Sequence, residues 1–397
     1  MQQISNANKI KLIFMVNLNL INGGGMERAL LYFIKYMPEE YRDIFDIKVI
    51  QTDIYDKIRI VDADISDILE QNSVEMIKLE NYNKNLFNSK IGLLDSLLNA
   101  LTEKRRNKNY SKLIEDVTSK ADIIYLFHNS FSSQISKGPI VIGSFHERNP
   151  NPKAYSWFSR VFIRFAIILI KSGVLFKRID YYHYQALNLE RYVPKKSFYI
   201  PLGLDLNKFM LDKKNESVDN IIRILFVGRL IKSKGIKIII DVFNIIKDKG
   251  RYELHIVGSG EMEYYIKNLK INGLVYHGQL NDESLIRLYK YCDVFVFPSQ
   301  SDIYGLVILE AIASMEYAIV SESLKGVFDD FERLNVLEYS KHNSHDIANR
   351  LMRFKKNTNR YNEKVYLMIK QKYDWQVIDK KLYNKFQELL NKSITNE

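Results

Sequence analysis

The strongest constraint on the fold is a regular alternation of short apolar runs and longer helical stretches, which occurs twice along the chain. The first half has strand-like runs at residues 9–17, 46–52, 121–128 and 139–146. The second half has them at 221–230, 252–260, 275–280, 293–300 and 318–323. Strands of about five residues that alternate with helices of about 10–15 residues are typical of parallel sheets built from βαβ units. We therefore predict an α/β protein with two Rossmann-like domains, whose parallel sheets face each other across an inter-domain cleft that holds the site.

The length of the chain also favours two domains. A chain of 397 residues is too long for one ordinary core and suits two domains of fewer than about 200 residues each. Turn signals in the run 197–209 and the polar stretch 210–220 mark the passage from one domain to the next. We predict a first domain over residues 1–205, a second over 206–375 and a terminal helix over 376–397.

The composition is that of a folded protein of a reducing compartment. Hydrophobic residues make up 46% of the chain and charged residues 26%, which excludes a disordered protein. Cys292 is the only cysteine, so no internal disulfide can form. The chain has no apolar run of about 18 residues that could span a membrane, and its first residues show no cleavage-site pattern. We expect a cytoplasmic location.

The net charge points to an anionic partner. The charge of +11 and the pI of about 9.2 suit a nucleic acid, an anionic lipid or a phosphorylated small molecule. The apolar stretch 159–178 carries Arg160, Arg164, Lys171 and Arg178 at helical spacing. Either this helix lies on an anionic membrane surface, or it packs in the core with a solvated basic face.

Glycine-rich loops follow three of the strand-like runs. In "NGGGMERAL", Gly23, Gly24 and Gly25 lead into a helix whose first N–H groups could bind an anion, although a tight turn alone would explain them. In "VGSGEME", Gly258 and Gly260 lack the full dinucleotide-binding spacing, which argues against a nicotinamide cofactor.

The loop "FVGRLIKSKG" gives the clearest phosphate signal. Gly228 ends a strand, Arg229 follows directly, and Lys234 precedes the next helix. A guanidinium and an ammonium at one strand end suit a diphosphate, whereas the alternative is a solvated basic loop. We favour the diphosphate because the pair lies at the carboxyl end of a strand.

Histidines also follow apolar strands. His128 and His146 each end a strand of the first domain, and either could face the cleft or be structural. His146 lies in the polar stretch "SFHERNP" beside Arg148, which favours a site. His255 alternates within a strand and is expected in the core. The run Asp-Ala-Asp at 62–64 imitates a metal-binding Asp-x-Asp pattern but lies in an acidic amphipathic stretch, so we assign no metal site.

Taken in order, these motifs resemble the retaining, nucleotide-sugar-dependent glycosyltransferases of family 4, which have the GT-B fold. The resemblance covers nearly the whole chain and includes "GGGMER", "SFHERNP", "IPLGLDLNKF", "FVGRLIKSKG", "IVGSGE", "HGQL", "DVFVFPS" and "DIYGLVILEA". The segment "YDWQVIDKKLYNKF" resembles the terminal segment of the family, which packs back on the first domain. The resemblance therefore implies a GT-B fold.

The resemblance also implies roles for the acidic residues of "SQSDIYGLVILEA". Glu310 matches the second of two family glutamates and would bind the ribose hydroxyls of the donor. Asp302 stands where the family usually has the first glutamate, near the donor sugar, and is one methylene shorter. The intervening donor-site residues are Tyr304, Gly305, Leu306 and Val307, of which the last three would offer backbone N–H groups to the sugar and phosphate.

The remaining roles follow from the same resemblance. Arg229 and Lys234 would neutralise the leaving diphosphate without a divalent metal or other cofactor. His146 would contact the transferred sugar, while the Gly23–Gly25 loop, with Glu27 and Arg148, would face the diphosphate or the acceptor. No nucleophile is assigned.

The sequence thus predicts a glycosyltransferase whose donor is a nucleotide sugar. The basic apolar helix and the net charge favour a polyprenyl-diphosphate-linked glycan acceptor at the anionic inner membrane surface, in capsule, O-antigen or related synthesis. An NAD-dependent oxidoreductase, a basic nucleic-acid-binding protein and a GT-B protein without activity are the alternatives. The first would need a complete Gly-x-Gly-x-x-Gly motif, which is missing.

Overall fold

The structure is a computed structural model of the whole chain, and the chain divides into two compact units. Unit 1 comprises Met1–Gly203 and Trp375–Glu397, and unit 2 comprises Leu204–Asp374. The sequence predicted domain boundaries after residues 205 and 375. Both lie next to the points where the chain passes from one unit to the other. The residues that the structure describes are 9–16, 25–52, 63–79, 108–127, 129, 132, 135–145, 168, 172, 176, 178–209, 219–249, 251–300, 302–314, 317–356 and 363–395.

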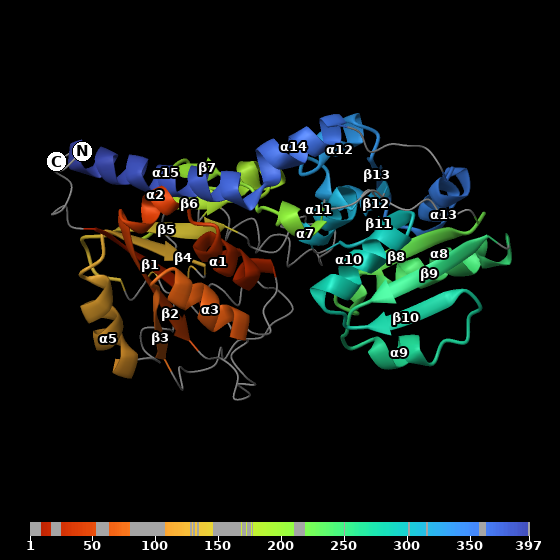
Figure 1. The fold of residues 1–397 in the computed structure, drawn as a ribbon, viewed down its shortest axis with the longest axis horizontal. Helices are drawn as coiled ribbons and strands as arrows, with labels where there is room; N and C mark the ends of the chain where they lie inside the picture. Colours follow the sequence, from red (N-terminus) through yellow and green to blue (C-terminus); the bar gives the residue numbers. More distant parts are fainter. Residues whose placement is uncertain are drawn as a thin grey trace. The chain divides into compact units, whose positions relative to one another are not determined.

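Unit 1 is built on a parallel sheet of seven strands in the order β3-β2-β1-β4-β5-β6-β7 (Figure 1). The strands are β1 Ile10–Val16, β2 Phe45–Thr52, β3 Glu75–Leu79, β4 Ile123–Leu126, β5 Ile140–Phe145, β6 Tyr181–Tyr184 and β7 Ser197–Tyr199. Strands β4 and β5 are buried along their whole length, as expected where helices cover both faces of a sheet. The strand order reverses between β1 and β4, which is where doubly wound sheets bind ligands.

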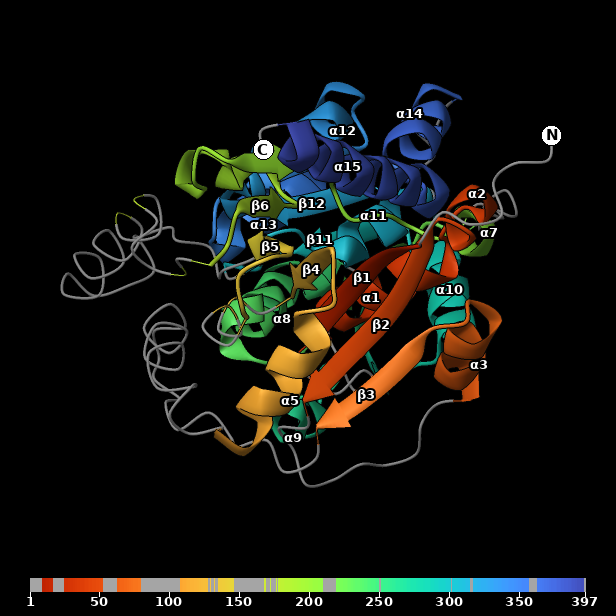
Figure 2. The same cartoon turned by 90° about the vertical axis from the view of Figure 1, so that its left-hand side faces the viewer.

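The helices of unit 1 include the last helix of the chain. They are α1 Gly25–Lys35, α2 Glu39–Arg42, α3 Ala63–Gln71, α5 Lys108–Thr118, the 3₁₀ helix η3 Leu187–Tyr192 and α15 Trp375–Thr395. The buried Tyr383 of α15 donates a hydrogen bond to the Phe33 carbonyl at 2.9 Å. Phe386 packs against Phe14 and Tyr125 with ring centroids 6.5 and 6.0 Å apart. Helix α15 therefore completes the core of unit 1 (Figures 1 and 2).

The basic stripe of residues 159–178 lies almost entirely outside the described residues. Of its four cations, the structure describes Arg178 alone. Its guanidinium donates to the carbonyls of Ser136 and Pro139 at 2.8 and 2.7 Å and pairs with Asp180 at 3.1 Å. Arg178 thus joins the segment before β5 to the segment before β6.

Unit 2 is built on a parallel sheet of six strands in the order β10-β9-β8-β11-β12-β13 (Figure 1). The strands are β8 Ile222–Val227, β9 Tyr252–Val257, β10 Leu274–Gly278, β11 Val294–Phe297, β12 Tyr317–Ser321 and β13 Leu337–Ser340. The order reverses between β8 and β11. Two parallel, helix-covered sheets confirm the predicted α/β class with two Rossmann-like domains.

Helices cover the sheet of unit 2. They are α7 Leu206–Phe209, η4 Lys232–Lys234, α8 Ile236–Ile246, η5 Lys247–Lys249, α9 Glu263–Lys267, α10 Asp282–Tyr291, α11 Leu306–Ala313, η6 Glu322–Leu324, α12 Asp329–Arg333, α13 Ser344–Arg353 and α14 Glu363–Tyr373. Ile239 and Phe243 of α8 and Leu351 of α13 share one apolar cluster with the strands. Within the described part of the chain, no helix is long and apolar enough to cross a membrane.

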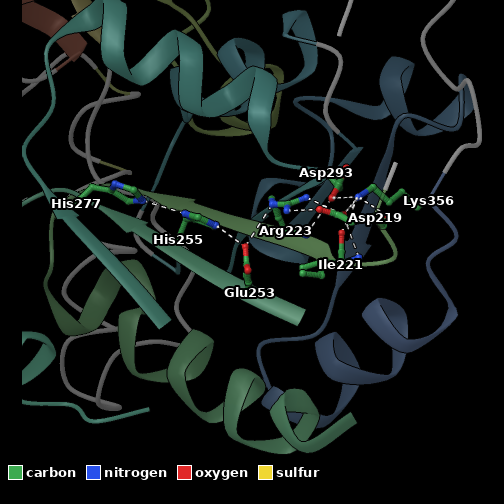
Figure 3. A network of polar contacts seen from close by, with 8 residues as sticks. All are labelled: Asp219, Ile221, Arg223, Glu253, His255, His277, Asp293 and Lys356. Carbon is green, nitrogen blue, oxygen red and sulfur yellow. Dashed lines mark hydrogen bonds and ion pairs between the residues drawn. The ribbon is translucent and has the colours of Figure 1, made fainter. Parts of the chain in front are cut away.

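A chain of polar contacts crosses β8, β9 and β10 (Figure 3). The buried guanidinium of Arg223 binds both carboxylate oxygens of Asp219, at 3.1 and 2.6 Å, and lies 3.3 Å from Glu253. His255 lies 3.5 Å from the same Glu253 and shares a hydrogen bond of 2.9 Å with His277. The pairing of β10 with β9 shifts register at His277, between Tyr276 and Gly278, and such a bulge can re-aim a side chain.

Candidate functional site

The strongest candidate site of the described residues lies at the carboxyl edge of the unit 2 sheet. Strands β8 and β11 are hydrogen-bonded neighbours, with Val294 opposite Ile224 and Phe295 opposite Leu225. The loops that follow them leave on either side of the point where the strand order reverses. The first loop carries Gly228, Arg229 and Lys234, and the second carries Asp302, so the fold brings these segments together.

Hydrogen bonds hold the two loops against each other. The Ser233 carbonyl accepts from the backbone N–H of Gln300 at 3.1 Å and from the Ser299 hydroxyl at 3.3 Å. Ser323 follows strand β12, and its hydroxyl donates to the Ser299 carbonyl at 2.9 Å. Side chains on these loops are therefore placed by fixed backbone.

Lys234 and Asp302 form an ion pair in this site, through Nζ and Oδ1. Their side chains are only 13% and 15% exposed. The second carboxylate oxygen of Asp302, Oδ2, is buried and has no hydrogen-bond partner among the described residues. Because an unpaired buried carboxylate oxygen is costly, this atom is suited to accept a hydrogen bond from a ligand hydroxyl.

The glycines that follow β9 are needed for close packing. Gly258 has φ of +132°, and a Cβ there would lie 2.0 Å from the Gly228 carbonyl oxygen. At Gly260 a Cβ would lie 2.8 Å from the Leu230 carbonyl oxygen. A hydrogen bond also joins the loops that follow β8 and β9, because the Leu230 N–H donates to the Ser259 carbonyl at 2.8 Å. The loop that follows β9 is thus packed onto the loop that follows β8. The side chain of Arg229, in the loop after β8, is exposed.

Helix α11 presents its N-terminus at the end of the Asp302 loop. Gly305 adopts the left-handed conformation, φ +74° and ψ +63°, and precedes the first helical residue Leu306. The Ile308 N–H donates to the Gly305 carbonyl at 2.9 Å, so the N–H groups of Leu306 and Val307 are the ones that come before the first hydrogen bond of the helix. With the helix dipole, such N–H groups favour an anion. Val307 lies in this turn, whereas the ring of Tyr304 is buried and packs on Phe328 at 5.7 Å.

Glu310 lies on the second turn of α11 and is half-buried. Its Oε2 accepts a hydrogen bond from the Tyr289 hydroxyl at 3.0 Å. Tyr289 was not predicted from the sequence as a site residue. It lies in an amphipathic helix just before a buried strand, where a tyrosine that packs in the core gives the same pattern.

Of the candidate residues of unit 1, Gly25 and Glu27 lie within the described residues. Gly23, Gly24, His128, His146 and Arg148 lie outside the described residues. Gly25 is the first residue of α1, and Glu27 lies in the same helix. The strands before these segments, β1, β4 and β5, are neighbours in the sheet, so the expected site positions all follow one stretch of its carboxyl edge.

A metal site is not among the features of the described residues. No group of three His, Cys, Asp or Glu side chains within the described ranges could hold an ion. The expectation that the site works without a divalent metal stays a prediction.

Sequence comparisons connect the chain with known proteins. The family model of glycosyl transferases group 1 matches residues 207–371. An uncharacterized glycosyltransferase of Methanocaldococcus jannaschii is 38% identical over 111 residues, which cover 27% of this chain and 28% of that protein. A capsular polysaccharide biosynthesis glycosyltransferase of Staphylococcus aureus is 31% identical over 140 residues, covering 32% of this chain and 36% of the relative.

A third relative is named for a lipid-linked substrate. The N,N'-diacetylbacillosaminyl-diphospho-undecaprenol alpha-1,3-N-acetylgalactosaminyltransferase of Campylobacter jejuni is 28% identical over 127 residues, covering 31% of this chain and 33% of that enzyme. The chain thus spans roughly a third or less of the length of these three curated relatives.

Comparison with solved structures covers almost the whole chain. Sucrose-phosphate synthase from Thermosynechococcus elongatus aligns with a TM-score of 0.70 and 15% identity, over 96% of this chain and 100% of that one. At this identity the likeness shows the fold alone. The chain therefore has the fold of the GT-B glycosyltransferases, and its second unit matches the glycosyl transferases group 1 in sequence.

Proposed function

We propose that the chain is a retaining glycosyltransferase of the family 4 type. It moves a hexosyl or N-acetylhexosaminyl group from a nucleoside-diphosphate sugar to an acceptor hydroxyl. The observation that carries this proposal is the Lys234–Asp302 pair at the point where the unit 2 strand order reverses. It places a cation for the diphosphate beside a carboxylate oxygen that lacks a partner among the described residues and can accept from a sugar hydroxyl.

The reaction breaks the bond between the anomeric carbon and the diphosphate oxygen, and the electron pair stays on that oxygen. Lys234 and the exposed Arg229 stabilise the developing negative charge, and the N-terminus of α11 adds its dipole. The acceptor oxygen attacks from the same face, and its proton passes to the leaving phosphate oxygen. The resemblance adds His146 beside the transferred sugar.

The proposed acceptor is a polyprenyl-diphosphate-linked glycan at the inner face of the cytoplasmic membrane, in capsule or related polysaccharide synthesis. The net charge of +11 and the names of the Staphylococcus and Campylobacter relatives support this choice. Flotation with anionic vesicles tests the peripheral contact. Absence of binding at low salt would count against it, because electrostatic attachment is strongest there.

The donor is tested by a thermal-shift screen with UDP, GDP, ADP and CMP, with and without magnesium, on wild type and Glu310→Ala. A ligand at 100 times its Kd stabilises the folded state by about 2.7 kcal/mol. We expect one nucleoside diphosphate to raise the melting temperature of the wild type without magnesium, and to raise that of Glu310→Ala much less. No shift with any nucleotide would leave the fold standing and refute the proposed function.

A further inference from the structure

We propose that Tyr289 is a positioning residue, which orients the Glu310 carboxylate toward the ribose hydroxyls of the donor. The inference rests on the proposed function, in which Glu310 accepts hydrogen bonds from that ribose. The Tyr289 side chain is fully buried and its hydroxyl donates to Glu310 Oε2, so it would act on the donor through that carboxylate.

The contact joins two helices that flank β11. Tyr289 lies near the end of α10, and Glu310 lies on α11, with β11 between them in sequence. The Tyr289 hydroxyl is 3.0 Å from Glu310 Oε2 and 3.4 Å from the Val307 carbonyl oxygen. A phenol has a single proton to donate, and the shorter contact is the one to the carboxylate.

The ring of Tyr289 has little freedom to move. Its centroid lies 6.3 Å from that of Phe209 in an edge contact and 6.1 Å from that of Phe295. Helix α10 is fixed at its start, because the Asn281 side chain caps it and Lys208 pairs with Asp282 at 2.9 Å. A phenol held this firmly can fix the carboxylate that it contacts.

The contact of the Tyr289 hydroxyl with Glu310 distinguishes a role in orienting the carboxylate from a purely structural role. A buried tyrosine needs one acceptor, and the Val307 carbonyl alone would satisfy it. A glutamate side chain, by contrast, has three rotatable bonds, and on a half-buried surface it loses rotamer freedom when it binds a ligand. Because Oε2 is already hydrogen-bonded to Tyr289, the Glu310 side chain has lost much of its rotamer freedom before the donor binds. This should lower the Kd of the donor.

The test compares ribose and deoxyribose ligands. Tyr289→Phe keeps the ring and removes the hydroxyl, and the matched control is Tyr264→Phe, whose tyrosine is 81% exposed on α9. The probes are the nucleoside diphosphate that stabilises the wild type and its 2'-deoxy form, with Kd measured by calorimetry. We expect Tyr289→Phe to weaken the ribonucleotide about tenfold, and the deoxyribonucleotide much less. The KM for the sugar donor should rise while kcat changes little.

Other outcomes would overturn the inference. Equal weakening of both nucleotides would mean that Tyr289 only supports the fold, and no weakening would mean that it does not act on Glu310. A double-mutant cycle gives an independent readout: in the Glu310→Ala background, Tyr289→Phe should have no further effect on Kd, so full additivity contradicts the proposal. If wild type binds the diphosphate and Glu310→Ala binds it measurably but more weakly, the proposed function survives either result. If wild type binds no diphosphate, both fail.

Discussion

Asp302 combines two chemical properties in one short side chain. One oxygen pairs with Lys234, and the other is buried without a partner among the described residues. A glutamate has one more methylene, so at this position it would set the distance between the cation and the second oxygen differently. In the proposed function, the shorter side chain would therefore set how close a sugar hydroxyl comes to Lys234.

We expect Asp302→Ala to lower the transfer rate on the order of tenfold to a hundredfold, which is the range for losing a hydrogen bond to a charged group. Asp302→Glu should keep part of the activity, because the charge remains. Steady-state transfer or donor hydrolysis measures both variants. Full activity of Asp302→Ala would remove this residue from the site.

Gly258 gives a second prediction at this scale. Its Cβ would lie 2.0 Å from the Gly228 carbonyl oxygen, and its φ is +132°. Gly258→Ala should therefore lower the free energy of unfolding by at least about 2 kcal/mol, from strain and steric overlap together. Gly228→Ala is the control for stability, because a Cβ there makes ordinary contacts at 3.7 Å. Urea unfolding compares the two variants, and equal effects would contradict the steric argument.

At the residue scale, sequence patterns locate loops better than partners. The pattern of "FVGRLIKSKG" predicted a strand exit with Lys234, and the structure places Lys234 beside Asp302. The sequence could not show that pairing, because the two residues lie 68 positions apart. The same holds for Tyr289, whose partner is 21 residues away on another helix.

At the scale of elements, the histidine pair of β9 and β10 makes stability depend on pH. Burial, and then the positive charge of the neighbouring His277, lower the pKa of His255, although Glu253 opposes this. Burial also lowers the pKa of His277. As the pH falls through the ordinary histidine pKa of about 6.5, the unfolded chain therefore takes up protons first.

The contribution of this pair to the free energy of unfolding should accordingly be complete above about pH 7. It should be lost progressively as the pH drops below about 6.5. His255→Gln with His277→Gln should flatten this slope, which denaturant unfolding at pH 5.5 to 7.5 would show. Some slope should remain, since burial also lowers the pKa of His342. His345→Gln is the control for the substitution itself, because its side chain is exposed on α13. An unchanged slope in the double variant would contradict the prediction.

Element prediction from the sequence worked best in the middle of each sheet. Runs such as 221–230 and 293–300 contain the buried strands β8 and β11. Strands β3, β6, β7 and β13 were not predicted from the sequence, and of these β3, β7 and β13 lie at sheet edges. Edge and short strands have fewer buried positions, so their sequences, such as "SFY" and "LEYS", lack a long apolar run.

At the scale of the whole molecule, Trp375 joins the last helix to unit 1. Its side chain is 1% exposed and its ring lies 5.2 Å from Tyr32 and 5.4 Å from Phe33. The backbone at Gly203 approaches so closely that a Cβ there would lie 2.7 Å from the Trp375 ring. This close approach is possible because residue 203 is a glycine.

Trp375→Ala should destabilise unit 1 by about 3–5 kcal/mol, as expected for removing a large buried aromatic side chain. Ile394→Ala on the same helix is the control, because its side chain is 66% exposed and should cost little. Chemical unfolding followed by circular dichroism would measure both. A loss of less than about 1 kcal/mol for Trp375→Ala would show that α15 is not anchored through this ring.

Unit 2 interrupts unit 1 as one continuous insertion whose two ends lie side by side. The Leu204 N–H donates to the Tyr373 carbonyl at 2.6 Å, and Leu204 pairs with Asp374 in an isolated bridge. A ribosome therefore completes the inserted unit before it makes α15, the helix that covers Phe14 and Tyr125. The unit begun first is the last to be finished, and its apolar surface stays open to chaperones, proteases and aggregation throughout the synthesis of the insertion.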